Sequence, residues 1–591
     1  MDLDAQNPFP TGRPKALLLD GHSRAAPEVV LSLGRVGVDV HVAAHSNDAL
    51  ALRARNAVRF IAQPARAERG AFAAWLRELD AREHYTLIVP SSDESLLGVA
   101  ELAESDDIRR RAVIASDESL RIALDKQATW ELAQRVGVDV PSNRILLQGD
   151  PVPPAGSLPT VLKPQSSMTR TSAGDRKLVV EIARSAEERA QKLTRMLRAS
   201  NVQEQEYVGV GGTGIGVECL YAHGKLVWAF VHERLHEYPL TGGGSSYRMS
   251  VSADAMILKP AIALLDAIAW HGVAMVEFKR TREGRLVLME INPRLWGSLA
   301  LGIDCGVDFP AGLLAIARGQ AASAQPAYRV GYRTRNVEAD LLWTKANLRA
   351  DKADPLLLTR PVARSLLEWL RPLAGKESWD YFAWNDLGPV RAMLARAARA
   401  EWKAISGRIK HARLDREARR RHAGVLQRAR ERGVARVVFL CYGNICRSPF
   451  AEAISARTLG ANRTTSFGVH TTAARTSPPH LIDAAATLGV DLRSHRSRTL
   501  AADDIRNDDL LLVMDLENYD WVARNAPALL GSTTLLGLFD AGSGSAEIAD
   551  PYSFDEERTG RVLRRIESAT RAMIAAVDIS RSPMAAESPT S

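Results

Sequence analysis

Apolar and polar positions at both ends of the chain alternate between strand-like and helix-like spacing. From Lys15 the apolar run KALLLD precedes a helical pattern (PEVVLSLGRVG), the run VDVHVAA, a helical pattern over 70–82, the run TLIVP, a helical pattern from Asp93 and the run AVIAS. Strands that alternate with helices in this way predict a parallel α/β sheet. A second unit of this type begins at Arg436 and continues to about Val577.

Between these two regions the pattern changes. One helix is expected from Asp117 to Val136, because a glycine and then a proline follow it. Strand-like runs then dominate through Asn292, namely TVLKP, QEQEYV, GVECLYAHGKLVWAFVHERL, GVAMVEFKR and RLVLMEIN. These runs predict an antiparallel sheet. Residues 326–395 show no clear pattern.

Composition narrows the class of protein. With 591 residues the chain exceeds one hydrophobic core, since domains hold about 150 residues. Hydrophobic residues at 46% and charged residues at 25% are typical of folded proteins and exclude disordered, collagen-like and fibrous classes. The chain has no run of 18 apolar residues and no signal-like start, so we expect a cytoplasmic protein. Its four cysteines match neither a disulfide framework nor a zinc pattern (Cys219, Cys305, Cys441 and Cys446).

Positive charge is concentrated in one segment. The formal charge is +8, but residues 396–436 alone hold 14 Lys and Arg against 4 Asp and Glu. This segment has strong helix formers and no proline, which predicts a basic helical connector. We interpret it as a solvated linker and expect no nucleic-acid binding. Weak contact of residues 396–436 with an anionic membrane surface is the alternative.

Residues 274–292 (AMVEFKRTREGRLVLMEIN) combine two strands with paired carboxylates. A hairpin loop of even length, of two residues (Glu283-Gly284) or four (TREG), places Glu277, Glu290 and Asn292 on one face, and the shorter loop sets the glutamates directly opposite each other. Opposed carboxylates repel unless a cation lies between them, and two carboxylates with an amide oxygen suit Mg²⁺. The pattern therefore predicts a magnesium site, with solvated carboxylates as the alternative.

Together with its surroundings, this hairpin resembles the ATP-grasp superfamily of carboxylate-amine ligases, over roughly residues 15–390. The residues that carry the resemblance follow one another in the family's order: the nucleotide-contacting lysines Lys126 and Lys163, the hinge Gln205-Glu206-Tyr207-Val208, the glycine-rich stretches 209–214 and 241–246, the hairpin, and then Pro293, Arg294, Trp296, Gly297 and Ser298. The second glycine-rich stretch resembles the family's mobile flap.

The resemblance implies ATP and Mg²⁺, with Mn²⁺ as an alternative metal. Glu277, Glu290 and Asn292 would hold the metal, and Lys126, Lys163, Gln205, Glu206 and Val208 would contact the nucleotide. ATP would phosphorylate a small-molecule carboxylate, an amine would capture the acyl phosphate, and Arg294 would help to neutralise the developing charge. The polar residues before the flap are candidates to meet the carboxylate substrate, or are simply the outward face of a strand (His232, Arg234, His236 and Glu237).

Residues 436–460 place a cysteine between a strand and a helix: RVVFL, CYGNICRS and PFAEAISARTLG. We expect Ser448 as the helix N-cap and Pro449 as the first helical residue. Cys441 would then lie under the helix N-terminus and near Arg447, both of which favour the thiolate. Loop N–H groups and the Arg447 fork would bind three phosphate oxygens. The spacing C-x5-R-S thus predicts a nucleophile that attacks phosphate.

This loop resembles that of the low-molecular-weight protein tyrosine phosphatase family, and the resemblance covers roughly residues 434–578. It implies that Ser448 steadies the thiolate, that Asn444 and His495 support the loop, and that Asp550 of the Asp-Pro-Tyr triplet protonates the leaving oxygen and then activates water. The family's second aromatic after that triplet is absent, and SFG stands where SAG is usual. The substrate is therefore left open between a phosphorylated small molecule and a phosphotyrosine protein.

Cys446 lies five residues after the nucleophile in the same loop. We hypothesise that it captures an oxidised Cys441 as a disulfide and prevents over-oxidation. The alternative is a small residue that merely fits the loop.

The resulting fold class is α/β: a Rossmann-like domain before a two-lobed α+β grasp, followed by a separate parallel-sheet phosphatase domain. The expected boundaries are 1–115 for the Rossmann-like domain, 116–325 for the ATP-grasp domain, 326–395 for an extension of the ligase part, 396–433 for the basic linker, 434–580 for the phosphatase and 581–591 for a disordered tail. A bifunctional ligase and phosphatase is the preferred function. The alternatives are a regulatory tyrosine phosphatase with an ATP-binding sensor domain, acting on a partner of polysaccharide biosynthesis, and a scaffold with one inactive domain.

Overall fold

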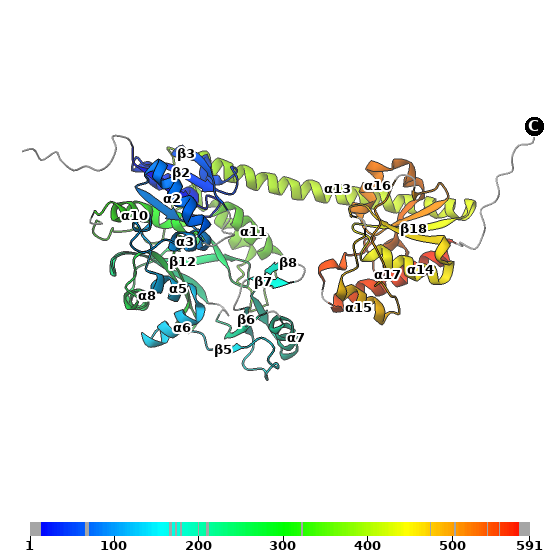
Figure 1. Ribbon diagram of the computed structural model, residues 1–591, viewed down its shortest axis with the longest axis horizontal. Helices are drawn as coiled ribbons and strands as arrows, with labels where there is room; N and C mark the ends of the chain where they lie inside the picture. The colour runs from blue at the N-terminus through cyan, green and yellow to red at the C-terminus, as the bar shows by residue number, and fades with distance from the viewer. Residues whose placement is uncertain are drawn as a thin grey trace, which may run out of the picture. The chain divides into compact units, whose positions relative to one another are not determined.

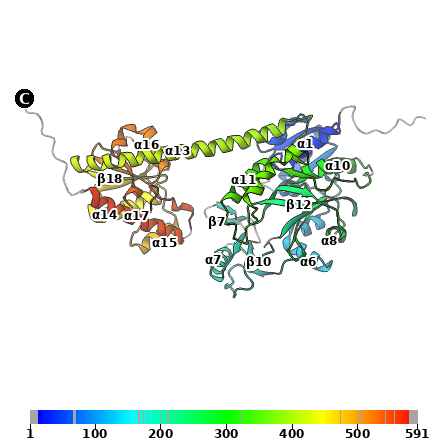
Figure 2. The same cartoon turned by 180° about the vertical axis from the view of Figure 1, so that it is seen from behind.

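The computed structural model shows the chain as two units, Met1–Arg399 and Ala400–Ser591, and each is described by itself. Figures 1 and 2 show the ribbon from opposite sides. The structure describes residues 13–64, 70–164, 168–171, 174–177, 180–198, 200–208, 212–320, 323–472, 474–501, 504–540, 542–554 and 556–577. The expected tail and residues 209–211 of the first glycine-rich stretch lie outside the described residues.

The first unit begins with the predicted parallel sheet. Its strand order is β3-β2-β1-β4, so the chain leaves β1 first toward one edge of the sheet and later returns to its other side. Every residue of β1 after Lys15 is buried, as expected of a central parallel strand. The elements are β1 (Lys15–Leu19), α1 (Ala26–Arg35), β2 (Asp39–Ala44), β3 (Ala57–Ala62), α2 (Ala71–Glu83), β4 (Leu87–Pro90), α3 (Asp93–Ala100) and α4 (Asp107–Ala112).

Three details of this region correct the predictions. The run AVIAS ends α4 and continues as irregular chain instead of a strand. Strand β3 lies at the sheet edge with mostly exposed side chains, so hydrophobic periodicity does not reveal it. The helix expected from Asp117 to Val136 is two helices, α5 (Asp117–Leu124) and α6 (Lys126–Arg135). They separate because Asp125 is extended and accepts the Ala128 N–H at 2.8 Å as the N-cap of α6.

The predicted antiparallel strands form two sheets. A four-stranded sheet has the order β5-β10-β6-β9, and a seven-stranded sheet has the order β15-β14-β11-β12-β13-β16-β17. The elements are β5 (Asn143–Leu146), β6 (Thr160–Pro164), β9 (Glu181–Ala183), α7 (Ala186–Leu197), β10 (Val202–Glu206), β11 (Thr213–Ala222), β12 (Lys225–Tyr238), β13 (Gly244–Ser250), α8 (Ala255–Ala267), β14 (Gly272–Arg280), β15 (Leu286–Asn292), α9 (Leu299–Cys305) and α10 (Phe309–Ala317), with a separate hairpin of β7 (Met168–Thr171) and β8 (Gly174–Lys177).

The two faces of the seven-stranded sheet enter different cores. Ile215 and Val217 pack in a cluster with α5, α6 and α8. Leu220 and Trp228 pack with α1, α9 and α10, in the cluster that also holds the core of the parallel sheet. Figures 1 and 2 show α8 and α10 on opposite sides of β12. This shared core holds the carboxyl ends of the parallel strands against the large sheet.

Residues 326–395, the expected extension of the ligase part, lie in the first unit and add two strands to the large sheet. Strand β16 (Arg333–Arg335) pairs with β13, and β17 (Glu377–Trp379) pairs with β16. Helices α11 (Val337–Arg349) and α12 (Val362–Leu367) lie between them in sequence. No single helix in the described part of the chain has the length and apolarity of a membrane span. Helices α9 and α10 pass such a test only as a pair bent by 86°.

Helix α13 (Gly388–Arg432) is the predicted basic helix, but it is not a solvated linker along its whole length. Met393 is buried in the first unit, whereas Ala418 and Val425 are buried in the two cores of the second. Lys410 forms an ion pair with Asp520 at 2.6 Å. The second part of α13 is therefore a packed element of the second unit, which begins at Ala400.

The second unit has the predicted parallel sheet, with strand order β19-β18-β20-β21. Phe439 of β18 packs with α14, α15 and α17, whereas Val438 and Leu440 pack with α16, so helices cover both faces (Figure 1). The chain leaves the carboxyl end of β18 directly into the cysteine loop. The elements are β18 (Arg436–Cys441), α14 (Arg447–Leu459), β19 (Thr464–Gly468), α15 (Pro479–Thr487), β20 (Asp509–Val513), α16 (Leu516–Asn525), β21 (Thr533–Leu535) and α17 (Glu556–Val577).

Candidate functional site

The β14–β15 hairpin places Glu277 directly opposite Glu290, as predicted, but by a different route. The loop is odd, because Thr281 and Arg285 are still paired through the Thr281 N–H and the Arg285 carbonyl at 2.9 Å. A one-residue bulge at Met289 then shifts the register and restores the opposition of the two glutamates. The expected even loop is therefore wrong, whereas the pairing it implied is correct.

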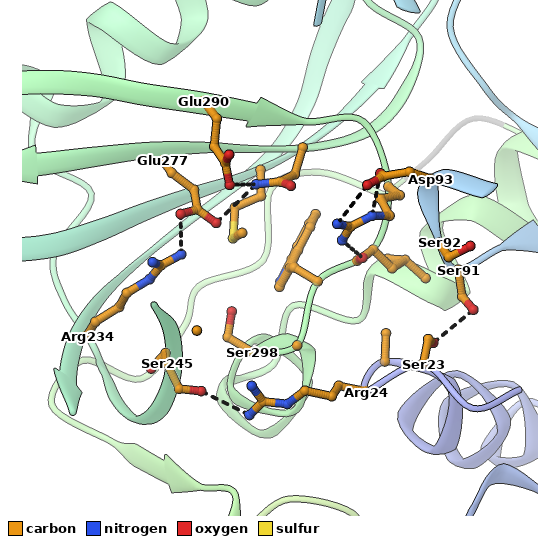
Figure 3. A pocket seen from close by; sticks show the side chains of 18 residues that line it. Ser23, Arg24, Ser91, Ser92, Asp93, Arg234, Ser245, Glu277, Glu290 and Ser298 are labelled. Carbon is orange, nitrogen blue, oxygen red and sulfur yellow. Dashed lines mark hydrogen bonds and ion pairs between the residues drawn. The ribbon is translucent and has the colours of Figure 1, made fainter. Parts of the chain in front are cut away.

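Asn292 and Arg234 complete the polar cluster around these carboxylates. The Asn292 amide donates from Nδ2 to Glu277 Oε1 at 3.0 Å and to Glu290 Oε1 at 3.2 Å. Arg234 Nη2 lies 2.5 Å from Glu277 Oε2 (Figure 3). Burial, only partly offset by Arg234, and the charge of Glu290 raise the pKa of Glu277. The half-buried Glu277 thus lies beside a second carboxylate, the exposed Glu290, and a bound cation would relieve the repulsion between them.

The donor set fits Mg²⁺. The amide nitrogen of Asn292 lies between the two carboxylates, where a cation would lie, and turning the amide would present its oxygen instead. No group of three His, Cys, Asp or Glu side chains in the described ranges is placed to hold a metal ion by itself, so the ligands would be these two carboxylates, the amide and phosphate oxygens. Glu277, Glu290 and Asn292 are thus brought together as predicted.

A cleft of about 420 Å³ opens beside the carboxylates. It is lined by several of the predicted nucleotide-contacting residues, and we call it the nucleotide cleft. Burial, followed by the like charge of Lys126, lowers the pKa of Lys163 to about 8, while Glu290 opposes the shift. Lys126 is exposed at the start of α6 and does not line the cleft, so it acts there through its charge. Lys279 of β14 also lines the cleft, although it was not among the nucleotide-contacting residues predicted from the sequence. The predicted residues in the lining are Lys163, Gln205, Glu206, Tyr207 and Val208.

The expected hinge and flap border the same cleft. Glu206 Oε2 accepts the Ser142 N–H at 3.2 Å, and the Tyr207 hydroxyl donates to the Leu356 carbonyl at 3.0 Å. Residues 241–244 of the flap also line it. A Cβ on Gly243 would lie 2.5 Å from the Tyr238 carbonyl oxygen, so only glycine permits this turn.

A second cavity of about 390 Å³ meets the first at Arg234, Gly244, Glu277 and Glu290. We call it the acceptor pocket. Arg294 lies in this pocket, where its Nε donates to Asp93 at 2.7 Å (Figure 3). Part of the wall comes from residues that sequence reasoning missed: Ser23, Arg24, Ser91 and Ser92, in the loops after β1 and β4. The available signal was their position directly after two buried parallel strands.

Two of the four polar residues before the flap do not face either cavity. His232 is fully buried with its Nδ1 3.1 Å from Glu218, and burial lowers its pKa. His236 stacks on Trp343 with ring centroids 3.3 Å apart and lies 2.8 Å from Asp340. Bulges in β12 around this residue turn its side chain into the core. Arg234 and Glu237 do line the nucleotide cleft.

In the second unit the cysteine loop surrounds the Cys441 sulfur with donors. The Asn444 N–H lies 3.2 Å from Sγ, and the Ser448 hydroxyl donates to it at 3.1 Å. Helix α14 begins at Arg447 with Cys446 in the N-cap position and no side-chain cap. The expected Ser448 cap is therefore wrong, because that hydroxyl is directed to the sulfur, and the first N–H groups of the helix are left for an anion.

Asn444 organises the loop. It has the left-handed φ of +48°, and its Nδ2 donates to Ser448 at 3.0 Å and to Ser466 at 2.8 Å. Its carbonyl lies 2.7 Å from Nε2 of His495, whose pKa is lowered by burial, so a neutral ring donates this bond. The structure thus brings Asn444, Ser448 and His495 together as the resemblance implies.

Arg447 is held beside the loop by two carboxylates. Its Nη2 donates to Asp550 at 2.7 Å, and its Nη1 donates to Asp515 at 2.6 Å. The buried Nε has no partner among the described residues and remains available to an anion. Asp515, the N-cap of α16, was missed, although an aspartate one residue beyond the buried strand β20 was visible in the sequence.

The remaining loop residues define its surroundings. Cys446 is buried, and this burial raises the pKa of its thiol. Tyr442 follows the cysteine directly and is 46% exposed, and its ring centroid lies 5.0 Å from that of His470. Tyr552 lies two residues after Asp550 and is 54% exposed. Exposed aromatic rings at a site of this kind suit an aryl ligand.

Family models match both regions in which these sites lie. Residues 436–583 match the model described as low molecular weight phosphotyrosine protein phosphatase. Residues 208–339 match the model described as ATP-grasp in the biosynthetic pathway with Ter operon.

Individual proteins are similar to parts of the chain. The low molecular weight protein-tyrosine-phosphatase Etp of Escherichia coli (strain K12) is 34% identical over 135 residues, which are 23% of this chain and 89% of Etp. The probable low molecular weight protein-tyrosine-phosphatase AmsI of Erwinia amylovora is 31% identical over 141 residues, 24% of this chain and 96% of AmsI. The crystal structure of N5-carboxyaminoimidazole synthetase from Staphylococcus aureus matches 55% of this chain and 82% of its own at 14% identity and a TM-score of 0.42.

Proposed function

Because the chain belongs, through residues 436–583, to the low molecular weight phosphotyrosine protein phosphatase family and carries an ATP-grasp domain, we propose that it is a bifunctional enzyme. The first unit joins a small-molecule carboxylate to an amine at the expense of ATP. The second unit hydrolyses a phosphate monoester. The observation that carries the ligase activity is that the nucleotide cleft and the acceptor pocket meet at Glu277 and Glu290.

In this proposal the chain's own residues place the two substrates. Residues 205–208 contact the adenine of ATP, and Lys163 contacts its phosphates. Glu277, Glu290 and Asn292 hold Mg²⁺, which screens phosphate charge when it is bound. The γ-phosphoryl group passes to a carboxylate oxygen of the acceptor, which yields an acyl phosphate and ADP. An amine then attacks the acyl carbon, and inorganic phosphate leaves as the amide forms.

The test uses the full chain with Cys441→Ser, so that the phosphatase does not consume phosphorylated products. ADP and phosphate release are measured with pools of carboxylic acids and amines. We expect ADP formation that requires an acid and an amide product that requires both components. ATP turnover that is independent of added acid would contradict the proposal. ATP binding without turnover in any pool would favour the alternative, an ATP sensor beside a phosphatase that acts on a partner of polysaccharide biosynthesis.

The phosphatase proceeds through a cysteinyl phosphate. Cys441 Sγ attacks phosphorus while Asp550 gives its proton to the leaving oxygen, so the alcohol departs. Water then attacks the cysteinyl phosphate, Asp550 takes a proton from it, and phosphate and the thiolate are released. Arg447 supplies a fork for the phosphate oxygens and is already oriented by Asp515. Tyr442 and Tyr552 favour an aryl ester such as phosphotyrosine.

Substrate preference is measured with phosphotyrosine, phosphoserine and hexose phosphates at equal concentration. We expect kcat/KM for phosphotyrosine to exceed that for the alkyl esters by at least tenfold. A preference for hexose phosphates would instead assign the site to a small metabolite.

A further inference from the structure

The acceptor pocket includes the point where the strand order of the parallel sheet reverses. Strand β1 lies between β2 and β4, and its carboxyl end leads to Ser23 and Arg24, while the end of β4 leads to Ser91. Ligands of open parallel sheets bind in the crevice outside the strand ends at such a point. The Ser23 hydroxyl donates to Ser91 at 2.8 Å, which ties the two loops together.

Arg24 extends from this crevice into the pocket and is held in place there. Its Nη2 donates to the Ser245 carbonyl at 3.0 Å (Figure 3). A Cβ on Gly297 would lie 3.4 Å from its Nε, and a Cβ on Gly244 would lie 3.3 Å from its Nη1. The lack of a side chain at Gly244 thus leaves room for the guanidinium, whose hydrogen bond to Ser245 uses one of its five N–H donors.

Arg24 differs from the other two arginines of the pocket in its charge balance. Arg234 is paired with Glu277, and Arg294 is paired with Asp93. Arg24 forms no ion pair with any carboxylate in the described ranges. Burial and then the nearby Arg248 lower its pKa, and the more distant Asp380, which is itself paired with Arg248, opposes this shift only in part. A partly buried guanidinium without a counter-ion is costly, and an anionic ligand would remove that cost.

We propose that Arg24, with the Ser23 hydroxyl, binds a second anionic group of the acceptor, a carboxylate or a phosphate, remote from the carboxylate that is activated. Figure 3 shows Arg24 across the pocket from Glu277 and Glu290, where activation takes place. A cavity of about 390 Å³ admits a small molecule with two anionic ends. This inference rests on the proposed ligase function, since that function makes the pocket the acceptor site.

The test measures binding instead of turnover. Full chain carrying Cys441→Ser is saturated with Mg-ADP and titrated with glutarate, 3-phosphonopropionate and butyrate. We expect at least one of the two dianions to bind ten times more tightly than butyrate, and the tighter dianion identifies the second group as carboxylate or phosphate. Arg24→Gln should remove this advantage, and Arg24→Lys should retain part of it. Only the Arg24-dependent part of the binding is counted, because the phosphatase loop also binds phosphonates.

Lys225→Gln, an exposed substitution at the start of β12, is the matched control and should bind like the parent. Thermal unfolding of Arg24→Gln shows whether the variant is folded, and Arg24→Lys provides a second variant if it is not. Equal binding of butyrate and both dianions, or dianion binding unaffected by both Arg24 variants, would overturn the proposal. Dianion binding that depends on Arg24, without ATP turnover on any acid, would overturn the ligase function and leave the anion site intact.

Discussion

Lys163 gives nucleotide binding a pH dependence that can be worked out from its surroundings. Burial and the charge of Lys126 lower its pKa from 10.5 to about 8, and this shift corresponds to roughly 3 kcal/mol against the charged form. Below pH 8 the ammonium is present to meet phosphate, and above pH 8 it is lost. Between pH 8 and 10.5 Lys163 is protonated in the unfolded chain but has released its proton in the folded, ligand-free chain. The free energy of unfolding of the ligand-free unit therefore rises with pH over that window.

If bound phosphates keep Lys163 protonated, the Kd for ATP should be about tenfold higher at pH 9 than at pH 7. Lys163→Arg should remove most of this change, because a guanidinium stays charged over the whole range. Calorimetric titration with Mg-ATP from pH 7 to 9.5 measures the effect, and Lys225→Arg is the control for a lysine far from the cleft. Parallel curves for the parent and Lys163→Arg would refute the contact between this lysine and the phosphates.

Three further substitutions test the assigned roles. Glu290→Gln should lower acid-dependent ATP turnover about a hundredfold without changing the temperature of thermal unfolding, whereas Glu283→Gln in the exposed loop should leave turnover unchanged. Equal turnover by Glu290→Gln and the parent would contradict the assignment of Glu290 as a metal ligand. Asp550→Asn should slow hydrolysis of esters with poor leaving groups about a hundredfold and p-nitrophenyl phosphate much less, and uniform slowing would exclude the acid role. After peroxide oxidises Cys441 to a sulfenic acid, the Cys446 thiol should form a disulfide with it and release water. A thiol reductant should then restore the phosphatase activity of the parent but not that of Cys446→Ser, and equal recovery would show that Cys446 has no protective role.

Much of the fold and of both sites follows from contiguous stretches of sequence. The α/β fold class and both family resemblances are confirmed. The loop from Cys441 to Ser448 could be predicted because its residues lie between one strand and one helix, so local geometry alone brings them together. Glu277 and Glu290 could be paired because strand register relates them across a single hairpin.

Features that depend on packing between distant segments could not be predicted. Arg24 and Ser91 reach the acceptor pocket only because the parallel sheet shares a core with the large sheet. Asp515 reaches Arg447 across two neighbouring strand ends. His236 looked like a site residue because regular alternation was assumed, and the bulges in β12 change the face to which it points.

The bulge at Met289 makes the pairing of the two glutamates tolerant of a deletion in β15. Phe278 pairs with Leu288 and Glu277 pairs with Glu290, so Met289 lies between two paired positions without a partner in the strand register. Removal of Met289 would leave Glu290 as the next residue opposite Glu277 and would turn the bulged ladder into a regular one. A homologue that lacks one residue just before its second glutamate should therefore keep the two carboxylates opposed and lose the bulge.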